Sequence, residues 1–156
     1  MNNSRQELLC LLHDACMYGQ GAAQLLTVFL ERHRDCGQDC AEIEISLAKT
    51  VENQRLLAEC LARIAEKTEV PLPQAMDCST ALRLEDPSAE NVLRELSHLR
   101  TGILQEIERY SCVIATAEVS GFFHTRLVCE GVLSDKLSMA AWLEQRASLN
   151  DQPGPA

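Results

Sequence analysis

The sequence is poor in aromatic residues and contains no long apolar run. Phe, Trp and Tyr together make up only 4 % of its 156 residues. Sandwiches and barrels normally need more aromatic and β-branched side chains, so this composition favours helices. The longest strictly apolar stretch near the start, residues 8–12, is too short to span a bilayer and lacks the flanks of a signal peptide. We therefore expect one cytoplasmic domain.

Positive charge is also scarce. Fourteen Lys and Arg residues stand against 23 Asp and Glu, which gives a formal net charge of -9. Nucleic-acid binding needs a concentrated positive patch, so this partner class is excluded, and a hydrophobic content of 46 % excludes a disordered chain. The sequence also lacks a glycine-rich phosphate loop and any Ser/His/Asp or Cys/His nucleophile arrangement. No common catalytic motif therefore points to an enzyme.

Helical periodicity is what the sequence has in abundance. Capping boxes begin at Ser4 and at Asp39, the prolines at 71 and 73 cannot continue a helix, and Gly121 suits the turn after a helix. Apolar residues recur in steps of three and four along four predicted helices, which cover residues 4–32, 39–67, 88–120 and 124–146.

Connection lengths then predict the fold class. Short turns make antiparallel hairpins of the first two and the last two helices, and residues 68–87, with a helical turn near 75–84, form a long crossover. We therefore predict an all-α, ferritin-like antiparallel four-helix bundle over residues 1–149 and a flexible tail over 150–156. The predicted core includes Leu12, Ala15, Leu26, Leu47, Leu57, Leu61, Ile103, Tyr110, Val128, Val132, Met139 and Trp142.

The chain contains eight cysteines. Five lie in helical apolar patterns, where a reduced thiol behaves as a small hydrophobe: Cys10, Cys16, Cys60, Cys112 and Cys129. In the first interhelical turn, His33, Cys36 and Cys40 have types and spacing that allow a zinc site, and the two thiols also allow a redox-sensing disulfide. The alternative is a polar turn with two incidental thiols.

Two segments of the sequence resemble a known family. Residues 129–143 read CEGVLSDKLSMAAWL, residues 106–110 read EIERY, and residues 115–121 read ATAEVSG. They resemble the last two helices of the YciE/YciF-type ferritin-like proteins, and Asp14, Thr50 and residues 59–61 match the first two helices more loosely. The resemblance implies a four-helix ferritin-like protein that is commonly dimeric and linked to stress responses, and many members carry carboxylates and histidines suited to a di-iron centre.

The metal ligands of that family are largely replaced in this chain. Gly19 stands where the family's first helix has a glutamate, and the second helix has Ser46, Lys49 and Asn53 in place of histidine, glutamate and glutamine. In the fourth helix, Lys136 and Leu137 follow Asp135 where further glutamates are usual. A carboxylate-bridged di-iron centre needs acidic ligands from all four helices. We therefore predict a lost metal site whose former interior is lined by Gly19, Ser46, Lys49, Asn53, Glu106 and Asp135.

Three functions stay open at this point. The preferred one is a non-catalytic, stress-associated homodimer that acts through protein–protein contacts and holds no cofactor. The second is a di-iron oxidase or iron-handling protein that uses Glu106 and Asp135, with Glu108 or Glu130. The third is a thiol or zinc sensor centred on the two thiols and the histidine of the first turn.

If the metal is lost, the carboxylates of the former site need another positive charge as a counter-ion. If Glu106 and Asp135 both face the bundle axis, leaving their charges unpaired is costly. Lys49 shares a helical face with Ser46 and Asn53, so its ammonium is expected to point at the place of the metal. In the alternative, Lys49 extends into solvent and the carboxylates are protonated or hydrated.

Overall fold

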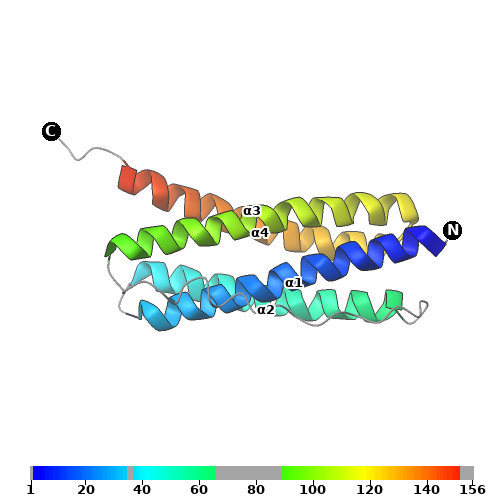
Figure 1. Ribbon diagram of the computed structural model, residues 1–156, viewed down its shortest axis with the longest axis horizontal. Coiled ribbons are helices and arrows are strands. Elements are labelled where there is room, and N and C mark those ends of the chain that lie inside the picture. Colours follow the sequence, from blue (N-terminus) through cyan, green and yellow to red (C-terminus); the bar gives the residue numbers. More distant parts are fainter. Residues whose placement is uncertain (1, 35–36, 66–88, 152–156) are drawn as a thin grey trace.

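The computed structural model describes residues 2–34, 37–65 and 89–151, and they form four helices: α1 (Asn2–Arg32), α2 (Gln38–Ala65), α3 (Ala89–Ser120) and α4 (Phe123–Asp151) (Figure 1). The described residues contain no strand, which confirms the all-α four-helix bundle. The fourth helix runs on to Asp151, five residues beyond its predicted end at 146, and includes the first two residues of the predicted tail. The predicted crossover with its helical turn, and the rest of the tail, lie outside the described residues.

Every pair of neighbouring helices in the bundle is antiparallel. α1 packs against α2 and α3, and α4 packs against the same two helices on the opposite side. One apolar cluster joins the first half of α1 and α4 to the second half of α2 and α3, and a second cluster joins the remaining halves. α2 therefore ends at one end of the bundle and α3 begins at the other (Figure 1). None of the described helices combines the length and apolarity that a bilayer span requires.

The turn after α3 shows how local sequence ends a helix. Gly121 has a φ of 81°, its N–H donates to the carbonyl of Glu118 at 3.3 Å, and the N–H of Phe122 donates to the carbonyl of Ala117 at 2.9 Å. These two bonds are a Schellman motif, which needs a left-handed residue and so favours glycine. Phe122 packs on the adjoining cluster and closes this end of the bundle, whereas Phe123 is 58 % exposed.

Most of the predicted core is buried, and the exceptions lie at the edges of the clusters. Leu47, Val128 and Trp142 are only partly buried, although each packs against one of the two clusters. Two predicted core thiols, Cys10 and Cys112, are exposed. Both lie on the outer side of their helices, α1 and α3. The prediction was wrong because a cysteine can complete an apolar pattern in the sequence without being buried in the fold.

The other three helical thiols are buried together in one cluster. Cys16, Cys60 and Cys129 come from α1, α2 and α4. Burial, together with neighbouring thiols of the same cluster, raises the pKa of Cys16 and of Cys129 to about 12. Because the thiolate is the reactive form, these thiols remain protonated and act as small hydrophobes.

A buried charged cluster joins three helices at the other end of the bundle. The Glu95 carboxylate accepts a 2.7 Å hydrogen bond from Arg32 Nε and pairs with the ring of His33, and the Cys40 thiol donates to the carbonyl of His33 at 2.6 Å. His33 and Cys40 are therefore engaged in structural contacts, and Cys36, the third predicted zinc ligand, lies outside the described residues. No three metal-ligating side chains come together in the part of the chain that the structure describes.

This cluster predicts a large effect of Glu95→Ala. Removal of a carboxylate that is only 2 % exposed deprives Arg32 and His33 of their shared acceptor. We expect a loss of about 3 kcal/mol in the free energy of unfolding, measured by urea denaturation. The control is Glu52→Ala, which removes an exposed ion pair with Arg55 and should leave the midpoint nearly unchanged. Equal midpoints for the two variants would contradict a structural role of the cluster.

Candidate functional site

An ion pair is buried between the two apolar clusters. Glu106 of α3 is 1 % exposed and Lys136 of α4 is 2 % exposed. The Lys136 ammonium nitrogen Nζ lies 3.5 Å from Glu106 Oε2, and it donates a 3.1 Å hydrogen bond to Oγ1 of Thr50 on α2. Three of the four helices are thus joined through one ammonium group.

The helical period explains why these charges are buried. Glu106 stands between Ile103 and Tyr110 in the inward stripe of α3, and Lys136 stands between Val132 and Met139 in that of α4. Desolvation raises the pKa of Glu106 to about 7, although the charge of Lys136 opposes the rise. Neither oxygen of the carboxylate accepts a hydrogen bond from the described residues. The lysine charge is therefore the main group that stabilises the ionised form.

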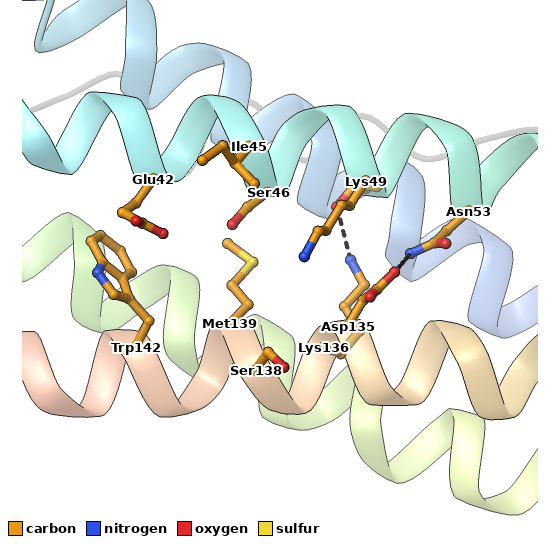
Figure 2. Close-up of a pocket in the computed structure, with 11 residues that line it drawn as sticks. Glu42, Ile45, Ser46, Lys49, Asn53, Asp135, Lys136, Ser138, Met139 and Trp142 are labelled. Carbon is orange, nitrogen blue, oxygen red and sulfur yellow. Dashed lines mark hydrogen bonds between the residues drawn. The ribbon is translucent and has the colours of Figure 1, made fainter.

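A cavity of about 80 Å³ lies beside the ion pair, between α2 and α4. These two helices pack less closely than the other three neighbouring pairs. Figure 2 shows Glu42 and Trp142 at one end of the cavity and Lys49 at the other. At the Lys49 end, the Asn53 amide donates a 3.3 Å hydrogen bond to Asp135 Oδ2. The remaining lining residues are Ile45, Ser46, Thr50, Lys136, Ser138 and Met139.

The residues predicted to line the former metal site do lie near one another, but at different depths. Asn53 is buried at the cavity, Ser46 and Asp135 are partly buried there, and Lys49 is exposed. Gly19 is buried on α1, and the space where its side chain would lie is filled from the neighbouring helices. A Cβ at Gly19 would overlap the side-chain amide of Gln54 and lie 3.4 Å from the Tyr110 hydroxyl.

The predicted internal counter-ion exists, but it is Lys136 and not Lys49. The inward position on this part of α2 belongs to Thr50, which is 2 % exposed. Because each helical residue turns the chain by about 100°, Lys49 lies beside this inward position and is exposed, with its side chain at the end of the cavity away from Trp142 (Figure 2). The signal for Lys136 was present in the sequence, since Lys136 stands four residues after Val132 and three before Met139 in the inward stripe of α4.

The residues present do not fit a di-metal centre. Glu108 and Glu130 are exposed, and Glu130 lies 3.6 Å from Nε of Arg126. Asp135 is only partly buried and is hydrogen-bonded to an amide, so among these four described candidate ligands Glu106 is the one that is fully buried. Carboxylate-bridged iron needs several inward oxygens at one place, and the ammonium of Lys136 beside Glu106 repels a metal cation.

The comparisons with known proteins support the fold. No protein family and no curated protein sequence matches this chain. The chain is similar to the crystal structure of a protein from Xanthomonas campestris pv. campestris, with a TM-score of 0.82 and 20 % sequence identity. The alignment covers 94 % of this chain and 92 % of that one. At this level of identity, the likeness establishes the all-α four-helix bundle.

The buried pair predicts that Lys136→Met destabilises the protein in a pH-dependent way. Near pH 8 the variant leaves an unpaired buried carboxylate at Glu106, and we expect a loss of about 3–5 kcal/mol in the free energy of unfolding. Near pH 5 the loss should be smaller, because the carboxyl is then protonated. The matched control is Lys49→Met, which removes an exposed lysine from the same cavity and should change stability by less than about 0.5 kcal/mol. A larger effect at Lys49 would contradict the assignment.

The raised pKa of Glu106 predicts a separate pH effect in the wild-type protein. Between the ordinary value of 4.5 and the folded value of about 7, the folded chain holds a proton that the unfolded chain has released. The resulting contribution of about 3 kcal/mol is fully present below pH 4.5 and is lost as pH rises through about 7.

The double variant Glu106→Met/Lys136→Met isolates this contribution. We expect it to lose the pH dependence and to be at least as stable as wild type near pH 8, since apolar side chains often replace a buried ion pair without loss. The measurement is the free energy of unfolding from pH 4 to pH 9. Parallel pH profiles for wild type and double variant would show that Glu106 titrates normally.

Proposed function

We propose that the protein is a non-catalytic, ferritin-like bundle, similar to the YciE/YciF-type proteins, in which an ion pair replaces the metal centre. The observation that carries this proposal is the Lys136 ammonium, 3.5 Å from the inward carboxylate of Glu106. A fixed cation at that place neutralises the carboxylate and repels a metal ion. The antiparallel neighbours, with α2 ending and α3 beginning at opposite ends, support the ferritin-like arrangement.

In this proposal the protein acts through protein–protein contacts, and the resemblance to YciE/YciF proteins adds an association with stress responses. Support for contacts comes from the exposed side of α4, where three large apolar side chains, Phe123, Leu127 and Leu137, are 50–59 % exposed. We call this surface the α4 outer stripe. Its members are Phe123, Leu127, Glu130, Gly131, Ser134, Leu137, Ser138 and Ala141, all of them exposed.

The low charge of the α4 outer stripe permits a second copy of the chain as its occupant. Two copies that each carry a net charge of -9 repel one another. Glu130 is the one charged member of the stripe, and it lies next to Arg126. A second copy therefore meets little repulsion along the stripe and covers exposed apolar surface. We propose a homodimer with this interface.

Loss of the metal centre predicts that the protein does not retain iron. After expression in iron-supplemented medium, we expect elemental analysis to find no stoichiometric iron in the folded, purified protein. The Lys136→Glu variant, which replaces the cation with a carboxylate, should bind more added Fe²⁺ than wild type does. About two irons per wild-type chain would contradict the proposal.

The interface is tested by light scattering. We expect wild type to show twice the chain mass of 17.3 kDa at micromolar concentration, and Leu127→Lys and Leu137→Lys should each shift it toward the monomer. Val51→Lys is the control, because Val51 is equally exposed, at 58 %, but lies on α2. A monomer mass for wild type at all micromolar concentrations would refute the dimer without affecting the metal prediction.

A further inference from the structure

The cavity between α2 and α4 carries opposite charges at its two ends. Glu42 and Trp142 lie together at one end, and the side chain of Lys49 extends into the other (Figure 2). Glu42 and Lys49 are seven residues apart on α2, so they share a helical face and are separated by about 10 Å along its axis. The Ser46 hydroxyl and the Met139 side chain lie between them.

These two charges differ from the others that line the cavity. Lys136 is paired with Glu106, and Asp135 accepts a hydrogen bond from Asn53. Within residues 2–34, 37–65 and 89–151, neither Glu42 nor Lys49 takes part in an ion pair. Asp135 is not in an ion pair either, but the hydrogen bond from Asn53 occupies one of its oxygens. The cavity therefore presents the Glu42 carboxylate and the Lys49 ammonium at opposite ends, and neither is paired with another charge among the described residues.

The two ends of the cavity favour ligand groups of opposite charge. A carboxylate beside an indole ring suits an ammonium group, because the ion pair and the cation–π attraction act on the same cation. A lysine suits a carboxylate. We propose that the cavity binds a small zwitterion of the ω-amino acid type, with its ammonium between Glu42 and Trp142 and its carboxylate at Lys49. The Met139 side chain would then pack on the aliphatic part of the ligand.

Ligands with one charge are disfavoured for electrostatic reasons. An anion that enters alone meets Glu42 and Asp135 in a chain of net charge -9, and a cation that enters alone meets Lys49 and Lys136. A zwitterion compensates both ends at once. A volume of about 80 Å³ is far below that of sites for drug-sized ligands, so the ligand has few heavy atoms. This binding does not require the proposed dimer, and either can fail without the other.

Trp142 is the only tryptophan of the chain and lies in the cavity, so its fluorescence reports binding directly. The probes are ω-amino acids of increasing length, from glycine to 6-aminohexanoate, with hexanoate and hexylammonium as the analogues that lack one charge. We expect a saturable change with a length optimum in the series, and affinities about tenfold weaker for both analogues. Equal affinity of the three six-carbon probes, or no saturable response from any ω-amino acid, would overturn the proposal.

Variants identify the two ends of the site. Glu42→Gln and Lys49→Met should each weaken binding of the best ω-amino acid about tenfold, whereas Lys49→Arg should retain binding. Glu44→Gln is the control, because Glu44 is an exposed carboxylate of α2 that does not line the cavity. All three positions lie outside the buried core, and circular dichroism verifies that the four variants are folded. Unchanged affinity in both Glu42→Gln and Lys49→Met would also overturn the proposal.

Discussion

The ion pair between Lys136 and Glu106 is the constraint on which the interior of this bundle depends. Each group loses its hydration on folding, and this cost is offset only while the two remain together. The pair therefore connects α3 to α4, and the hydrogen bond to Thr50 extends the connection to α2. The polar cavity occurs where α2 and α4, the least closely packed neighbours, meet beside this pair.

The two ends of the bundle are held by different chemistry. One end has the buried carboxylate of Glu95 with its arginine and histidine partners, and the other has an apolar cluster with protonated thiols. The functions that we propose rest on the cavity and on the α4 outer stripe. Both involve α4, whose inner side carries a lysine while its outer side carries exposed leucines, so polar and apolar residues are not segregated as in an ordinary surface helix.

Much of the fold could be predicted because its determinants are local. Steps of three and four between apolar residues gave helix limits close to those observed, and Gly121 marked a real turn, since the left-handed conformation favours glycine whatever surrounds it. The depth of each predicted site residue was harder to derive. Glu106 faces inward as expected. On α2, however, the buried position belongs to Thr50, and Lys49, one residue before it, is exposed.

By itself, then, the sequence determined the number and kind of the described helices, their limits apart from the end of the fourth, and the presence of an acidic group in their core, because these follow from periodicity along one segment. The tertiary structure decided which lysine pairs with Glu106 and that Cys10 and Cys112 face outward. It also decided that the partner of His33 is Glu95. Each of these depends on how one helix is rotated against another. That rotation is set by packing between distant segments, which no local pattern encodes.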